Sequence, residues 1–300
     1  MEQNQRYGFT LIELSIVLVI IGLIIGGILI GRDLIEVARV RQQITQIEKY
    51  NTAVHTFRLK YGFLPGDIPD PTASEMGFGQ RGPYPGEGDG NGLIEGVNIE
   101  NGAGSCNGCT SGLYLAAGEN GLLWSDLGAA SLISFPVNLY ASYGPAYAAV
   151  AAWSGVGLDQ WDPKAVIGQG NYVYAYSNNG INYFGISAID YFLGGNSNQV
   201  DAEPGLTPQQ AYAIDSKIDD GMPQTGRVNT LYITSGDQLW YAGANTNNNG
   251  VGANGPVPGT AANASALTCY DNGGNAANPM QYSIASAGNN MNCALSFQFQ

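Results

Sequence analysis

The hydrophobic residues near the amino terminus form one unbroken run. Eighteen consecutive uncharged, mostly aliphatic residues lie between Leu14 and Gly31, and a helix of this length crosses most of a bilayer. Beyond this run, apolar residues recur at steps of three and four, which predicts one buried helical face. They are Leu34, Ile35, Val37, Ala38, Ile44, Ile47, Tyr50, Val54, Phe57 and Tyr61. A single helix from Phe9 to Tyr61 would be about 80 Å long.

Glycine and proline mark where this helix weakens and where it ends. Small-xxx-small spacing, which permits close contact between helices, occurs twice, in Gly22, Gly26, Gly27 and Gly31. Glycine lowers helix stability by about 1 kcal/mol per residue, so local melting of this stretch on assembly is a hypothesis. Gly62 and the prolines that follow it predict the end of the helix. The only histidine, His55, lies near the apolar face and is interpreted as a packing residue.

The remainder of the chain predicts short elements around a sheet. One helix is expected at 121–133 and a second between 204 and 221, where Thr207, Pro208 and Gln210 form a capping-box start and Gly221 a stop. Strands are expected at 172–176, 181–189, 230–234 and 239–241, with an edge or closing strand at 294–299. Loops are expected at about 76–112 and at 242–266. The predicted fold class is α+β, a long N-terminal α-helix packed against an antiparallel β-sheet head with large loops.

Charge divides the chain at the same place. Only 12% of the 300 residues are charged and the formal net charge is -13. Residues 9–61 contain six basic and four acidic residues, whereas residues 62–300 contain four basic and 19 acidic ones. An acidic head of this kind does not favour nucleic-acid binding. Because His55 is the only histidine, metal sites built on two histidines are excluded, and histidine-dependent catalysis would have to use this residue.

The residues in front of the apolar run are unlike a secretory signal peptide. The candidate processing site, Gly8-Phe9, precedes the apolar run, whereas a signal peptide is cut after it. Glu13 places a carboxylate where lipid would make it costly. This carboxylate could lie at the level of the lipid head groups. Alternatively, it needs a buried cation, and cleavage after Gly8 would create one, the α-amine of Phe9.

The segment Gly8-Phe-Thr-Leu-Ile-Glu13-Leu-Ser and the aliphatic run after it resemble the prepilin signal of type IV pilins and type II secretion pseudopilins. The resemblance covers about the first 30 residues. Three shorter segments also resemble parts of large-headed pilin-like proteins: 61–67, 124–127 and 218–226. The stretch 9–61 lacks the proline at which many pilins kink.

The resemblance implies a leader at 1–8, a polymerisation and transmembrane helix at 9–61 and an acidic globular head at 62–300. It implies cleavage by prepilin peptidase between Gly8 and Phe9, N-methylation of Phe9, and pairing of Glu13 with the Phe9 amine of an adjacent subunit. The expected partners are other pilin-like subunits, the peptidase, an inner-membrane assembly platform and, before assembly, membrane lipid. The expected location is the bacterial inner membrane, followed by a periplasmic or extracellular filament.

Two other functions compete with a filament subunit. A membrane-anchored surface binding protein that does not polymerise is the main alternative. An anchored hydrolase is the other, but the sequence offers no convincing pair of nucleophile and base. The expected class is therefore a structural protein and not an enzyme. A head of 239 residues favours a minor or specialised subunit over a densely packed major one.

Two acidic segments are candidates for calcium. In the first, Glu87, Asp89, Asn91 and Glu95 stand at positions 1, 3, 5 and 9 of an EF-type loop, although Asn98 occupies position 12, where a bidentate Glu is expected. The alternative is a flexible acidic turn. In the second, Asp215, Asp219 and Asp220 oppose the dipole at the end of the 207–220 helix. Lys217, Arg227 or a calcium ion could compensate these charges.

The four cysteines are Cys106, Cys109, Cys269 and Cys293. Thr110 stands where a c-type haem motif requires histidine, which excludes that group. An exported head favours disulfides over a zinc site built from all four cysteines. Of the three possible connectivities, we favour Cys106 with Cys109 and Cys269 with Cys293.

Overall fold

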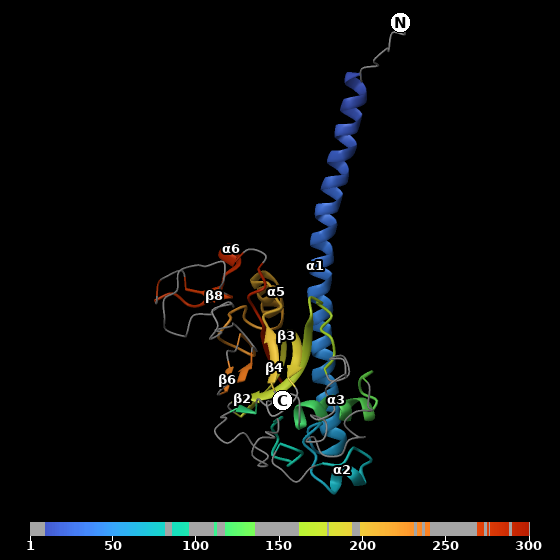
Figure 1. Cartoon of the computed structure of the whole chain (residues 1–300), viewed down its shortest axis with the longest axis vertical. Helices are drawn as coiled ribbons and strands as arrows, with labels where there is room; N and C mark the ends of the chain where they lie inside the picture. Colours follow the sequence, from blue (N-terminus) through green and yellow to red (C-terminus); the bar gives the residue numbers. More distant parts are fainter. Residues whose placement is uncertain are drawn as a thin grey trace.

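One helix of 51 residues, α1 (Leu11–Tyr61), runs the length of the molecule (Figure 1). Its second half packs against the head, and its first half extends away from it. The helix ends where the sequence predicts, because Gly62 adopts the left-handed conformation (φ 82°) and donates its N–H to the Arg58 carbonyl. The long helix and the antiparallel sheet confirm the α+β class.

The structure is a computed structural model. It describes residues 10–81, 86–95, 111–112, 118–135, 162–178, 180–193, 199–230, 233–235, 238–240, 269–272, 275, 277–287 and 290–299. The predicted loop at 242–266 lies outside these residues, as does most of the one at 76–112.

A six-stranded antiparallel sheet forms the centre of the head. The strand order is β1 (Ser111–Gly112), β2 (Asn171–Asn178), β3 (Ile181–Leu193), β10 (Leu295–Phe299) and β5 (Val228–Asn229). The sixth strand, β4 (Gln199–Glu203), pairs with the end of β3 beyond a bulge between Ile189 and Tyr191. The carboxyl-terminal strand is interior, so the edge position considered for it is wrong. Strand β10 pairs with β3 over five residues and with the two-residue β5 on its other side.

Smaller elements surround this sheet. Two-stranded pairs are formed by β6 (Ile233–Ser235) with β7 (Gln238–Trp240), and by β8 (Tyr270–Asp271) with β9 (Gln281–Tyr282). Two helices are single turns, α2 (Thr72–Glu75) and α6 (Ile284–Ala287). Figure 1 places α2 at the end of the head farthest from the amino terminus, and α5 and α6 at the opposite end.

The two longer helices of the head differ from the sequence prediction mainly in their bounds. Helix α3 (Glu119–Ala129) ends four residues before the predicted limit, and Ser131 then adopts a positive φ of 57°. Helix α5 (Pro208–Ile218) confirms the predicted capping box. The Thr207 N–H donates to Gln210 Oε1 at 2.9 Å, and the Gln210 N–H donates to Thr207 Oγ1 at 3.2 Å.

Aromatic rings connect α1 to the sheet. The ring of Tyr50 in α1 packs edge-on against Trp124 of α3, with 4.9 Å between centroids. Trp124 stacks on Phe184 of β3 at 5.8 Å, and Phe184 stacks on Phe299 of β10 at 4.1 Å. Such pairs add about 0.5 to 1.5 kcal/mol each beyond the area that they bury. This column therefore fixes the second half of α1 to the head.

Two glutamines of α1 add polar contacts to the same interface. The fully buried Gln43 accepts the backbone N–H of Ile167 at 3.0 Å. Gln46 accepts the N–H of Val166 at 3.0 Å and donates to the carbonyl of Lys164 at 2.8 Å. The segment before β2 is thus held along α1 by side-chain amides.

The helix buries less of its apolar face than the sequence pattern predicts. Burial begins at Val40, whereas Leu34, Ile35 and Val37 are 66%, 56% and 45% exposed. These positions have the correct spacing, but they lie beyond the end of the head. His55 is also exposed, so its interpretation as a packing histidine is wrong.

Candidate functional site

The first turn of α1 is closed by Thr10 and Glu13. The backbone N–H and the hydroxyl of Thr10 donate to one Glu13 carboxylate oxygen at 2.7 and 2.8 Å, and the Glu13 N–H donates to Thr10 Oγ1 at 3.4 Å. This is a capping box, and its Thr-x-x-Glu signature in the sequence could have identified it. Glu13 is exposed, so its carboxylate can exchange this local partner for a charged one. Gly8 and Phe9 lie outside the described residues, and cleavage and methylation there stay predictions.

The free half of α1 presents apolar side chains on all sides. From Leu11 to Val37 the large apolar side chains are between 45% and 87% exposed. A Cβ added at Gly22, Gly26, Gly27 or Gly31 would meet nothing within 4 Å, so the shallow grooves at these glycines are open to a neighbour. This is the one helix in the described part of the chain that is long and apolar enough to cross a membrane.

The first acidic loop wraps around carboxylates that lie outside it. The Glu119 carboxylate, at the start of α3, accepts the backbone N–H groups of Gly88, Asp89 and Glu95 at 2.9, 3.3 and 2.9 Å. Asp67 accepts those of Gly90 and Gly92 at 2.7 and 2.9 Å. Burial raises the pKa of Asp67 to about 6 and that of Glu119 well above its usual value. The loop is therefore ordered by its own amides.

The structure regroups the residues predicted to bind calcium there. Carboxylate oxygens of Asp67, Asp89 and Glu119 lie within 4.8 Å of one another, so only Asp89 of the predicted set belongs to this group. Asn91 donates its side-chain amide to Asp89 and to Glu95 at 3.2 and 2.9 Å. Glu87 is buried, and Asn98 lies outside the described residues. Carboxylate oxygens suit calcium, and calcium binding at this loop stays a prediction.

Two of the short segments that resemble pilin-like heads lie together below the end of α1. The N–H of Gly66, in the segment 61–67, donates to Asp126 of α3 at 2.6 Å. The same Asp126 oxygen forms a buried ion pair with Arg81 at 2.6 Å. Burial raises the pKa of Asp126, although Arg81 opposes this shift. Removing one member of such a pair leaves an uncompensated buried charge. These two segments therefore stabilise the turn of the chain that follows the end of α1.

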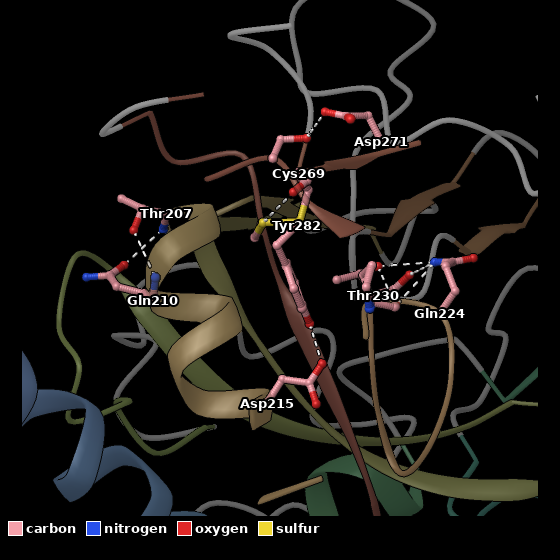
Figure 2. Close-up of a disulfide and its surroundings, with 11 residues drawn as sticks. Thr207, Gln210, Asp215, Gln224, Thr230, Cys269, Asp271 and Tyr282 are labelled. Atoms are coloured by element: carbon pink, nitrogen blue, oxygen red, sulfur yellow. Dashed lines mark hydrogen bonds between the residues drawn. A yellow bond between two sulfur atoms is a disulfide. The ribbon is translucent and has the colours of Figure 1, made fainter. Parts of the chain in front are cut away.

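The acidic cluster after α5 is compensated locally. Asp215 accepts hydrogen bonds from the Tyr282 hydroxyl at 2.7 Å and from the Gly221 N–H at 3.2 Å (Figure 2). Asp219 accepts the backbone N–H groups of Arg227 and Val228, and Asp220 accepts the N–H of Met222 and the hydroxyl of Thr225. Burial raises the pKa of Asp215 to about 6.

Within residues 199–230, which the structure describes throughout, neither Lys217 nor Arg227 forms an ion pair with these three carboxylates. The charge compensation expected from those two side chains is instead supplied by backbone amides and hydroxyls. One oxygen from each of Asp215, Asp219 and Asp220 lies within 4.8 Å of the others. Calcium binding at this second cluster also stays a prediction.

A disulfide joins Cys269, just before β8, to Cys293, just before β10, with 5.0 Å between the Cα atoms (Figure 2). This is the pairing that the sequence favours. Both cysteines are fully buried, and the backbone of Cys293 also pairs with Leu206. Cys106 and Cys109 lie outside the described residues, so their pairing stays a prediction.

Comparison with known proteins assigns the amino terminus. Residues 3–29 match the family model of the prokaryotic N-terminal methylation motif. This motif is the prepilin signal of type IV pilins and pseudopilins, and it confirms the resemblance seen in the sequence. No curated protein and no solved structure matches the chain. The amino terminus is therefore that of a pilin-like precursor of the kind that prepilin peptidase processes.

Proposed function

We propose that this pilin-like precursor is a structural subunit of a type IV pilus or of a secretion pseudopilus, and that it assembles through α1. The observation that supports this proposal is the exposed apolar surface from Leu11 to Val37. Removing apolar surface from water is favourable by about 25 cal/mol per Å². An apolar surface that surrounds half of a long helix is therefore expected to be buried against lipid or protein. The bilayer covers it before assembly, and neighbouring α1 helices cover it in the filament.

Glu13 sets the axial position of each subunit in this proposal. Cleavage after Gly8 turns the Phe9 nitrogen into a positively charged α-amine, which methylation leaves charged. An unpaired carboxylate among apolar helices costs at least about 2.5 kcal/mol, and the Phe9 amine of an adjacent subunit removes this cost. Until then, Thr10 holds the carboxylate at the helix terminus.

The remaining parts of the proposal concern partners and location. Prepilin peptidase would mature the chain in the bacterial inner membrane, and an assembly platform would add it to a polymer of pilin-like subunits. The filament would then be periplasmic or extracellular. The head, which packs against the second half of α1, would supply surface or partner contacts.

Replacement of Glu13 tests assembly directly. Glu13→Gln removes the charge and nearly preserves the shape, and Glu13→Ala removes the side chain. Both should abolish incorporation into sheared filaments, as seen by electron microscopy and immunoblotting, while the amount of chain in the membrane stays unchanged. The matched control is Glu48→Gln, at an exposed glutamate of the same helix, which should assemble normally. Unimpaired assembly of the Glu13 variants would favour a membrane-anchored binding protein instead.

A further inference from the structure

One end of the head lies close to the point where the apolar run of α1 stops. At this end, Gln210 in the first turn of α5 donates to Glu36 of α1 at 2.5 Å. Glu36 follows Gly31, the last residue of the uncharged run, by five positions, which is about 7.5 Å along a helix. A bilayer that holds residues 14–31 therefore ends beside α5 and α6, and α2 lies at the far end of the head (Figure 1).

The described segments that follow β7 and lie at this end carry almost no charge. Among residues 269–272, 275, 277–287 and 290–293, Asp271 is the only charged side chain, whereas residues 62–237 contain 18 acidic and four basic ones. Asp271 is half-buried and accepts the Ser283 hydroxyl at 2.6 Å. Two large apolar side chains stand out from the surface here, Ile284 at 37% and Met291 at 48% exposure.

This end of the head is also firmly braced. The disulfide between Cys269 and Cys293 joins its two strand segments, and Leu206 and Cys293 exchange two backbone hydrogen bonds of 2.9 Å. Tyr282 reaches from β9 to Asp215 in α5 (Figure 2). Ile284 and Met291 are therefore presented on a fixed framework that is attached to α5, and through α5 to α1.

We propose that this end of the head, with Ile284 and Met291 at its surface, rests on the phospholipid head groups while the subunit is stored in the membrane. The inference depends on the proposed function, because it requires the free half of α1 to lie in the bilayer. Lipid is the favoured occupant for two reasons. The face lies level with the point where the apolar run of α1 stops. Its one acidic side chain among the described residues between 269 and 293, Asp271, is half-buried and hydrogen-bonded, so the face carries little charge that lipid phosphates would repel or that would be costly to bury.

Docking of this kind would give the stored head one orientation. The exposed acidic side chains at the far end, Glu75 in α2 and Asp89 in the first acidic loop, would face the solvent. They would thus be available to partners before the subunit leaves the membrane.

Lipid-quenching fluorescence on the full-length chain tests the proposal. The chain is reconstituted at one copy per phosphatidylcholine nanodisc, with its disulfides intact. A fluorophore is attached to a cysteine introduced at Ala285 in α6 or, as the matched site, at Ser74 in α2; both positions are exposed. Head-group spin-labelled lipid should quench the label strongly at 285 and leave the label at 74 bright. Equal, weak quenching at both sites would overturn the proposal.

Charge variants identify the contact. Ile284→Glu with Met291→Glu should remove most of the quenching at 285, whereas Met76→Glu, an exposed methionine at the other end, should leave it unchanged. Near-ultraviolet circular dichroism checks that each variant is folded, and the comparison of sites 285 and 74 in the unaltered head is independent of these variants. Quenching at 285 that arises only in discs with two copies would assign the face to a second subunit and overturn the proposal.

A third label separates this inference from the proposed function. A fluorophore attached to a cysteine introduced at Leu23, near the centre of the run 14–31, should be quenched by lipids that carry the spin label in the acyl chain. If the label at 23 is quenched and the label at 285 is not, the anchor is correct and the docked head is wrong. If the label at 23 is not quenched, the membrane anchor itself is wrong, and both proposals fail.

Discussion

The two halves of α1 share one secondary structure and have opposite environments. From Val40 to Tyr61 the helix buries a regular face, including Val40, Ile47, Val54 and Phe57, against the head. From Leu11 to Val37 it buries none of its large apolar side chains. A helix with one apolar stripe is complete within its own chain, whereas a helix that is apolar all round needs lipid or other helices. The first half is therefore suited to partners, and the second to the head.

The largest expected effect is on the free energy of unfolding of the head, which should respond to substitutions in the packed half of α1 and not to those in the free half. Phe57 is fully buried and its ring contacts those of Tyr61 and Phe78. Phe57→Ala should lower the free energy of unfolding by about 3 to 5 kcal/mol, because it opens a cavity in the core. Leu59→Ala, at a side chain that is 89% exposed, and Leu18→Ala in the free half should each change it by less than about 0.5 kcal/mol. Denaturant unfolding of the full chain in detergent measures these values, and a large effect of Leu18→Ala would contradict the division.

The pH dependence of stability tests the contact between the packed half of α1 and the head. Trp124, which packs on Tyr50 of α1, donates its indole N–H to Asp162 at 2.9 Å, and burial raises the pKa of Asp162 to about 8. Between pH 4 and pH 8 the folded chain therefore holds a proton that the unfolded chain releases. Linkage then makes this group lower the stability as the pH rises, by about 3 kcal/mol between pH 5 and pH 7.

Asp162→Asn should remove this contribution, because its amide does not titrate and can still accept the Trp124 hydrogen bond. Unfolding curves at several pH values should give the variant a flatter decline between pH 4 and pH 8 than the native chain. Glu48→Gln, at an exposed position of α1, should retain the native curve. An unchanged decline in Asp162→Asn would show that Asp162 is not the group responsible.

A smaller effect is expected from the polar contacts of the packed half. Gln43→Ala should lower the free energy of unfolding by about 1 to 2 kcal/mol, because it leaves the buried Ile167 N–H without its acceptor. The neighbouring Gln42 is exposed, so Gln42→Ala is the matched control and should have almost no effect. Hydrogen exchange of the Ile167 amide should accelerate in the first variant only. Equal exchange in both variants would contradict the assigned contact.

The smallest expected effect lies in the free half. Gly22→Ala with Gly26→Ala adds methyl groups that meet nothing within 4 Å in the single chain. Head stability should change by less than about 0.5 kcal/mol, whereas the yield of filaments should fall if neighbouring helices approach these glycines closely. Circular dichroism and filament yield give the two readings. A loss of head stability would contradict the independence of the halves.

Local signals were sufficient for the parts of the fold that depend on neighbouring residues. Gly62 ends α1 and Thr207 with Gln210 begins α5, as their side-chain and backbone chemistry requires. The position of β10 inside the sheet depends on pairing with β3 and β5, and no local pattern contains that information. The exposure of Leu34 and Val37 likewise depends on where the head ends, which helical spacing does not reveal.

The acidic loops also depend on long-range contacts that local sequence patterns do not reveal. The spacing within 87–95 identified Asp89, but Asp67 and Glu119 lie far from it in the sequence and are brought to it by the backbone amides of the loop. The sequence also showed that Asp215, Asp219 and Asp220 needed compensation, and suggested side chains or calcium for it. Backbone N–H groups, which no residue letter displays, supply much of that compensation.

Mass spectrometry of the amino-terminal peptide of the chain in the sheared filament fraction tests the central claim, that α1 is a matured assembly helix. This peptide should begin at Phe9, carry one added methyl group on the Phe9 nitrogen, and be recovered with the filaments. A chain that remains in the membrane fraction and retains Met1, or that begins unmodified at another residue, would contradict it.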